Sequence, residues 1–192
     1  LTMPRRYAFR YLEIEVVDTS LKWQLVVENV TCRSVSAVEM SAAVPYKSED
    51  KMLERMDLVS LRTLCNCMQS VFEDGPKRDR RLWIGDLRLQ ALANYATFQN
   101  YDLVKRCLYL FAGLTRSDGR VGACLFTEPE YLVDDTFLTD YSLFFAPVLL
   151  DYYEATKDSV TLGELAPCAY RQIELIGEMF TEDHLFVGDG ET

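Results

Sequence analysis

Thirteen consecutive residues, DGPKRDRRLWIGD at positions 74–86, concentrate side chains that can do chemistry. They include three carboxylates, Asp74, Asp79 and Asp86, spaced so that a turn could bring them around one pocket. Glycoside hydrolysis needs such a set, because one carboxylic acid protonates the leaving oxygen while a second carboxylate activates water or attacks the sugar. A nearby carboxylate or partial burial raises the pKa of a carboxylic acid, which helps it to keep its proton.

The same stretch holds two further side chains suited to a sugar ligand. Trp83 offers an apolar plate for the C–H face of a sugar ring, and the Arg78 guanidinium can donate two hydrogen bonds to hydroxyls or orient a carboxylate. A plainer interpretation stays open here: Asp-Gly-Pro ends one helix and turns the chain, the basic residues are solvated, and Gly85-Asp86 begins the next helix. The charge pairs would then be surface pairs, each worth less than about 1 kcal/mol.

Composition and charge narrow the classes of partner. The chain has 192 residues, 49% of them hydrophobic, and a formal net charge of -10. That charge repels polyanions, so neither nucleic acid nor an anionic membrane surface is expected as a partner. No run approaches the ~20 apolar residues of a membrane span, and the first residues lack the apolar core of a secretion signal. Localisation is left open between cytoplasm and periplasm.

The residue types that usually bind metals or attack substrates give no pattern for those roles. The six cysteines include no CxxC pair, so we expect neither a metal site nor a cofactor. We interpret the cysteines as reduced and mostly buried, acting as small hydrophobic side chains. His184, the only histidine, is predicted to be a surface residue, so a Ser–His or Cys–His nucleophile pair is not expected.

The chain changes character near residue 45. Before it, YLEIEVV at 11–17 alternates apolar and acidic residues, which predicts a half-buried strand, and 23–38 is a second β-rich run. Two or three strands do not make a stable sheet on their own. Residues 1–44 are therefore predicted to be the last strands of a larger β-domain.

After Pro45 the apolar residues repeat with helical spacing and predict five helices. Ser48-Glu49-Asp50 supplies an N-cap and first-turn acids for the first helix, and Asn100 is the predicted cap of the third. The predicted buried faces of the first three helices are Leu61, Leu64, Met68, Val71 and Phe72, then Leu89, Leu92, Ala93 and Ala96, then Val104, Cys107, Leu108 and Phe111.

The second half of this region combines long connections with two more helices. A turn is predicted at 117–119 and an ordered loop at 120–138. The fourth helix is predicted at 140–156 with a kink at Pro147, and the fifth at about 162–180. Five helices with uneven connections fit either a bundle or part of a larger all-helical toroid, and in both cases we expect function in the chemically rich loops.

Three segments together carry a resemblance to a known family: DGPKRDRRLWIGD, DGRV at 118–121 and TDYSL at 139–143. They resemble the bacterial α-L-rhamnosidases, an inverting glycoside hydrolase family whose (α/α)6 barrel follows a β-domain. The resemblance covers nearly the whole chain. It implies a mainly α fold with an incomplete (α/α)6 toroid: residues 1–44 would be the C-terminal strands of a β-sandwich, and 45–192 the N-terminal part of the barrel.

The resemblance also implies roles, anchored on Gly85-Asp86. Asp79 falls seven residues before Asp86, at the position of the general acid, where the family usually has Glu. The Cys that usually follows the first acid of the loop is Gly75 here. Substrate-binding roles are implied for Asp74, Arg78, Trp83, Asp86 and Asp140.

The implied activity is hydrolysis of terminal α-L-rhamnosides with inversion, on a carbohydrate substrate and without a cofactor. The general base is expected beyond Thr192, so the 192-residue chain alone is expected to be inactive. Loop acids are weaker candidates for a base: Glu128, Glu130, Asp134 and Asp135.

Two alternatives stay open. One is a non-catalytic relative that binds a glycan or a protein, and the other is a six-hairpin glycosidase acting on another sugar, such as a uronide. Self-association through exposed helix faces is a further expectation.

Overall fold

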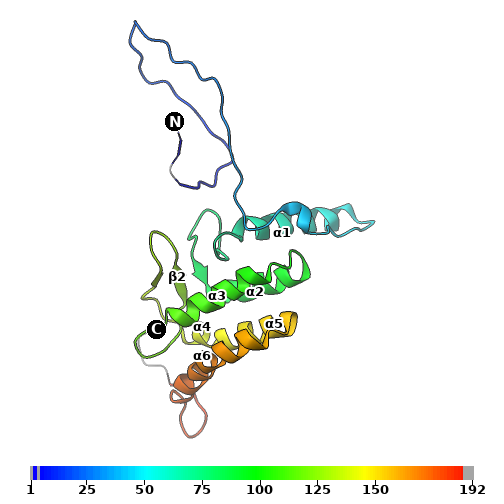
Figure 1. The fold of residues 1–192 in the computed structure, drawn as a ribbon, viewed down its shortest axis with the longest axis vertical. Coiled ribbons are helices and arrows are strands. Elements are labelled where there is room, and N and C mark those ends of the chain that lie inside the picture. The colour runs from blue at the N-terminus through cyan, green and yellow to red at the C-terminus, as the bar shows by residue number, and fades with distance from the viewer. Residues whose placement is uncertain (1, 4, 188–192) are drawn as a thin grey trace. The chain divides into compact units, whose positions relative to one another are not determined.

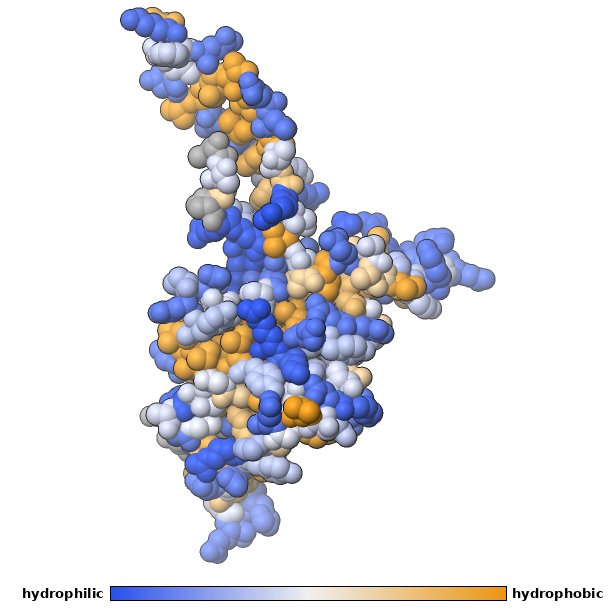
Figure 2. Space-filling view, viewed as in Figure 1, coloured by the Kyte–Doolittle hydropathy of each residue, from blue (hydrophilic) through white to orange (hydrophobic). Residues whose placement is uncertain are grey.

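A computed structural model describes residues 2–3 and 5–187, and these fall into two compact units, one up to Val35 and one from Ser36 onward. Within its described residues the first unit is extended and contains no assigned strand. Leu12, Ile14 and Val16, the predicted buried face, are all more than half exposed, and Figure 2 shows hydrophobic side chains along the surface of this segment.

The prediction of hydrogen-bonded strands at 11–17 and 23–38 is therefore wrong for this structure. The physical reason is that a strand satisfies its backbone only against a neighbouring strand, and two strands are marginal without further partners. Their assignment to a β-sandwich stays a prediction.

The second unit is mainly helical, with six α-helices in its described part where five were predicted (Figure 1). A small antiparallel sheet of order β1-β2-β3 joins the loops and pairs Leu82 with Leu125, and Leu125 with Val133. The elements are the 3-10 helix η1 (Met40–Ala42), α1 (Lys51–Cys67), β1 (Leu82–Trp83), α2 (Ile84–Ala96), α3 (Tyr101–Gly113), β2 (Cys124–Phe126), β3 (Leu132–Val133), α4 (Thr139–Leu143), α5 (Phe145–Thr156) and α6 (Ser159–Gly177).

The first helix begins where the sequence predicts and ends earlier. Asp50 is its N-cap, and the Asp50 carboxylate accepts a hydrogen bond from the Met52 N–H at 2.8 Å. The helix ends at Cys67, but Met68, Val71 and Phe72 are fully buried all the same. Their apolar spacing therefore reflects burial in a turn after the helix, and the prediction of one continuous helical face was wrong.

The predicted buried face of α2 was also wrong. Leu89 is 72% exposed and Leu92 43% exposed, whereas Leu87, Ala91 and Asn94 are buried. The sequence does not indicate this buried face, because Asn94, one of its residues, is polar. Its side-chain amide donates to the Asn100 carbonyl oxygen and accepts from the Asn100 N–H, so burial leaves neither group unsatisfied.

The third helix matches its prediction: the Asn100 side chain caps it by accepting from the Leu103 N–H, and Val104, Cys107, Leu108 and Phe111 are buried. The turn at 117–119 is also confirmed, closed by a hydrogen bond from the Gly119 N–H to the Arg116 oxygen. Gly119 has a φ of 90°, in the left-handed region that favours glycine.

The predicted fourth helix is two helices, because the chain breaks at Phe144 between α4 and α5. Pro147 lies in the first turn of α5, where the backbone N–H that proline lacks would have no partner within the helix. In one continuous helix the proline ring would clash with the Leu143 carbonyl group, so α4 and α5 are separate helices. The fifth prediction corresponds to α6, which starts at Ser159 with Asp158 as its N-cap and holds Pro167 inside. The predicted loop at 120–138 contains β2 and β3.

The core of this unit is formed by large apolar side chains from the helices and from the turn after α1. In the described part of the chain, no helix is both long and apolar enough to cross a membrane. The largest fully buried side chains include Phe72, Phe111, Phe145, Met68, Leu82, Ile84, Leu87, Leu108, Leu125 and Leu149.

Candidate active site

The charged loop at 74–86 is fastened by its first carboxylate. The Asp74 carboxylate accepts hydrogen bonds from the Asp79 N–H at 2.9 Å and the Arg81 N–H at 3.0 Å. The Asp74 N–H in turn donates to the Arg81 oxygen at 3.0 Å. Gln90 on α2 donates to the oxygen of Glu73 at 2.7 Å, so the start of the loop is fixed against the next helix.

The predicted general acid, Asp79, lies on the outer side of this loop. Its side chain is 34% exposed and lies 3.6 Å from the Nε of Arg78, whose own side chain is 89% exposed. An ion pair this exposed adds little stability. The backbone of Asp79 is held by Asp74, while its carboxyl group stays accessible.

The end of the loop is positioned by the sheet. Trp83 in β1 pairs with Cys124 in β2, and the Ile84 N–H donates to the Ala123 oxygen at 3.1 Å. These contacts fix the start of α2, where Asp86 occupies the first turn. Burial, together with the negative charge of Asp74, raises the pKa of Asp86 above the ordinary aspartate value.

A shallow hollow of about 370 Å³ joins the start of α2 to α4. Its lining residues come from the two helices and from the break between α4 and α5: Gly85, Asp86, Leu89, Asp140, Tyr141 and Phe144. Asp86 and Asp140, two of the predicted binding residues, thus meet in one site although they are far apart in sequence.

Tyr141 forms the aromatic wall of this hollow and was not assigned a role from the sequence. Its ring packs edge-on against Trp83 at a centroid distance of 6.1 Å and against Phe144 at 5.8 Å. A Cβ on Gly85 would lie 2.9 Å from the Tyr141 ring, so glycine is what lets the ring approach α2 so closely. Trp83 therefore supports the wall from behind Tyr141, and Arg78 extends toward solvent.

The acids of the 120–138 segment are placed differently. Asp134 pairs with Arg81 Nη1 at 3.2 Å, and the Cys124 thiol donates to it at 3.1 Å. Burial acts to raise the pKa of Asp134, but hydrogen bonds from Cys124 and its neighbours outweigh that effect and lower it. Asp134 is thus a structural carboxylate. The others, Glu128, Glu130 and Asp135, are exposed.

Two more features bear on chemistry at this site. Cys124 is a buried free thiol, and burial raises its pKa to about 12, so it is not a nucleophile at neutral pH. Within the residues that the structure describes, no cluster of three or more His, Cys, Asp or Glu side chains is arranged to hold a metal ion.

Gln172 on α6 is a further residue that no pattern in the sequence singles out. It is fully buried, and it bonds both to the turn before β2 and to Ser142 of α4. A glutamine within an amphipathic helix is normally read as a solvent-facing residue, so only its tertiary contacts distinguish it.

Comparisons with known proteins agree with this architecture. Residues 42–170, more than half of the chain, match the family model of the bacterial alpha-L-rhamnosidase 6 hairpin glycosidase domain. Residues 1–34 match the glycosyl hydrolase family 78 alpha-rhamnosidase N-terminal domain. A search of curated proteins found no match.

Two solved structures are similar to the chain. One is a rhamnosidase from Klebsiella oxytoca with rhamnose bound, at 53% identity and a TM-score of 0.73, covering 75% of this chain and 28% of that one. The other is the GH78 family rhamnosidase of Bacillus sp. GL1, with 23% identity and a TM-score of 0.57, covering 65% of this chain and 13% of that one; this likeness concerns the fold alone.

The helical unit is thus of the six-hairpin glycosidase class. The chain belongs to the bacterial α-L-rhamnosidase family of glycoside hydrolases, as the sequence resemblance predicts. It spans 28% of the Klebsiella oxytoca rhamnosidase and 13% of the Bacillus one.

Proposed function

We propose that the protein, in its full natural length, hydrolyses terminal α-L-rhamnosides with inversion at the hollow between α2 and α4. The observation that carries this proposal is that Asp86, the last residue of the loop that includes Asp79, lines one hollow together with Asp140. Support also comes from the 53% identity to a rhamnosidase with rhamnose bound. Asp74, Arg78 and Trp83 are proposed to complete the substrate-binding wall. Asp74 does so by holding the backbone of Asp79, and Trp83 by packing against Tyr141.

The proposed reaction needs two carboxyl groups. A water oxygen attacks the anomeric carbon while the glycosidic C–O bond breaks, and Asp79 gives its proton to the leaving oxygen. A second carboxylate takes a proton from the attacking water, and we place this base outside residues 1–192. The isolated 192-residue chain is accordingly proposed to bind without turning substrate over.

The hollow favours a neutral sugar over an acidic one. Its polar lining consists of the Asp86 and Asp140 carboxylates and the Tyr141 hydroxyl, and none of its lining residues is basic. A uronide carboxylate would meet like charge there, whereas neutral sugar hydroxyls can donate hydrogen bonds to the carboxylates. A deoxy sugar such as rhamnose also has a methyl group, which can pack against Leu89 or Phe144.

The test is turnover of a chromogenic α-L-rhamnoside by wild type, Asp79→Asn and Asp102→Asn. Loss of a general acid lowers kcat by about a hundredfold or more, so we expect that loss for Asp79→Asn. Asp102, which is exposed in the first turn of α3, is the matched control and should leave kcat unchanged. The anomer first formed, followed by NMR, tests inversion.

Each remaining outcome has its own meaning. An active Asp79→Asn variant would place the acid elsewhere. A wild-type protein that cleaves no glycoside yet binds rhamnose would support the non-catalytic relative, which the Asp at the usual Glu position motivates. Self-association remains a prediction, to be tested by the sedimentation of the purified protein.

A further inference from the structure

Gln172 uses both ends of its buried side-chain amide to join three segments. Its Oε1 accepts hydrogen bonds from the Val121 N–H at 2.9 Å and from the Ser142 hydroxyl at 2.6 Å. Its Nε2 donates to the Gly119 oxygen at 3.0 Å and to the Cys168 oxygen at 3.0 Å. The side chain is 0% exposed, so water does not substitute for these bonds.

Two of the partners, Gly119 and Val121, lead to the α2 wall of the hollow. Gly119 and Val121 belong to the turn that precedes β2. Two residues beyond Val121, the Ala123 oxygen accepts from the Ile84 N–H, which sets the start of α2 with Gly85 and Asp86. A shift of this turn is therefore passed through Ala123 and Ile84 to the position of Asp86.

Another partner, Ser142, leads to the opposite wall of the hollow. Ser142 is buried in α4, directly after Tyr141 and two residues after Asp140. A helix of five residues is too short to be stable by itself, so tertiary contacts must set its position. The Ser142–Gln172 hydrogen bond is one such contact, and it links α4 to α6.

We propose that Gln172 is a positioning residue that sets the separation of the Asp86 and Asp140 walls of the hollow. Gln172 does not line the hollow, and its one amide group instead bonds to the segments that carry both walls. The proposal rests on the proposed function for its substrate, a neutral sugar, but the geometric coupling stands apart from turnover.

The first test compares Gln172→Met with Asn94→Leu in the full-length protein. Asn94 is the matched control, because it is also a fully buried amide bonded to backbone, at the α2–α3 turn away from the hollow. Both variants should lower Tm. Only Gln172→Met should raise KM for the chromogenic rhamnoside, on the order of 10- to 100-fold, since small displacements of positioned groups have effects of that size. Equal KM values for folded Gln172→Met and wild type would overturn the proposal, as would an equal rise in Asn94→Leu.

The second test uses Gln172→Glu, which keeps the acceptor and makes the donor depend on pH. A buried glutamic acid has a raised pKa, and when protonated it can donate to the Gly119 oxygen as the amide does. KM of this variant, relative to wild type at each pH, should therefore approach one as the pH falls and increase as it rises. A ratio that does not change with pH contradicts a role for the Gly119 bond.

Amide hydrogen exchange separates this proposal from the proposed function. In Gln172→Met, segments 119–124 and 139–143 should both exchange faster than in wild type, and in Asn94→Leu neither should. If wild type cleaves no rhamnoside, the proposed function fails while the exchange result still decides the coupling. Faster exchange in only one segment would show that Gln172 does not join the two walls.

Discussion

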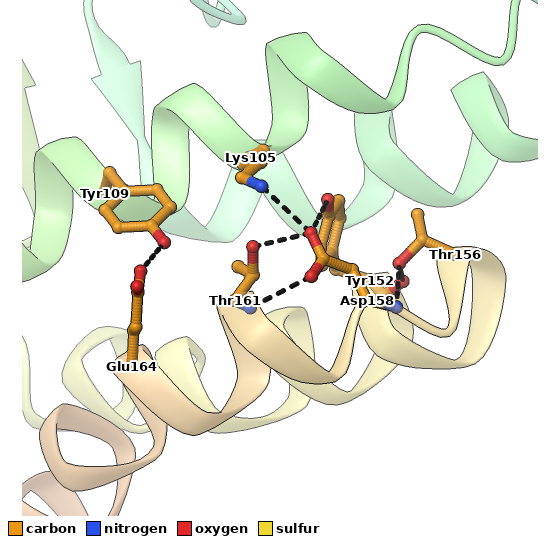
Figure 3. Close-up of polar contacts among 7 residues, drawn as sticks. All are labelled: Lys105, Tyr109, Tyr152, Thr156, Asp158, Thr161 and Glu164. Carbon is orange, nitrogen blue, oxygen red and sulfur yellow. Dashed lines mark hydrogen bonds and ion pairs between the residues drawn. The ribbon is translucent and has the colours of Figure 1, made fainter.

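Two groups of carboxylates in the helical unit differ in what surrounds them. Asp158, between α5 and α6, accepts hydrogen bonds from Lys105 at 2.9 Å, from the Tyr152 hydroxyl at 3.2 Å and from both the hydroxyl and the N–H of Thr161 (Figure 3). Next to it, Tyr109 on α3 donates to Glu164 on α6. These polar groups satisfy one another.

The hollow is the opposite case. Among the residues that the structure describes, no lysine or arginine forms an ion pair with Asp86 or Asp140. The pKa shifts follow the same division: the Thr161 N–H and hydroxyl and then Lys105 lower the pKa of Asp158, while burial and Asp74 raise that of Asp86. The carboxylate of Asp158, which has several partners, stabilises the fold, and the carboxylates of Asp86 and Asp140, which have no such cationic partner, are available to a ligand.

The largest expected effect comes from substituting Asp86, a carboxylate of the hollow. Asp86→Asn should weaken rhamnose binding by about 10- to 100-fold, since hydrogen bonds to a charged group contribute about 1.5–3 kcal/mol. The same change should not lower Tm at neutral pH, because a raised carboxyl pKa means that the folded state resists ionisation. Calorimetric titration and thermal melts of one preparation check both halves. A lower Tm would mean that Asp86 stabilises the fold after all.

A smaller effect is expected from the glycine behind the aromatic wall. Gly85→Ala places a methyl group 2.9 Å from the Tyr141 ring, so the ring must move. We expect kcat/KM to fall about tenfold, within the range that displaced positioning groups produce. Gly163→Ala is the matched control, because a Cβ there meets no atom within 4 Å. Unchanged kinetics in Gly85→Ala would remove Tyr141 from the site.

The smallest effect on function is expected from the satisfied group. Asp158→Ala should lower Tm by a few degrees through loss of the α6 cap and of the Lys105 pair, with KM unchanged. Since the folded-state pKa of Asp158 is depressed, its stabilisation is present above the ordinary aspartate pKa of about 4 and is lost as the pH falls below it. Thermal melts from neutral to acidic pH should show that the Tm values of wild type and Asp158→Ala become equal in acid. A Tm difference that persists in strong acid would assign the effect to packing.

Local signals in the sequence were sufficient for the ends of several helices. Asp50 and Asn100 are recognisable caps because a short polar acceptor precedes an amphipathic run. Asp158 was missed because the predicted helix began three residues too late. The face of α2 was misread because a buried Asn and an exposed Leu invert the usual pattern, and only the contact with Asn100 explains the inversion.

The residues of the site also fall into those that local sequence patterns identify and those that only tertiary contacts identify. The loop 74–86 could be selected from residue types and family resemblance, and Asp140 from the motif around it. The pairing of Asp86 with Asp140 in one hollow, and the part played by Tyr141 and Gln172, depend on segments distant in sequence. Spacing within one segment carries no information on such contacts, so it could not predict them.

The hairpin formed by β2 and β3 has a further consequence, for how such a protein can change over evolutionary time. Its paired residues end at Phe126 and Leu132, and residues 128–131 between them are exposed. An insertion at this tip leaves the ladder to β1 and the start of α2 as they are, so the loop can lengthen or vary while the hollow keeps its geometry. Diversification can therefore act at the tip of the hairpin separately from selection on the sugar-binding walls.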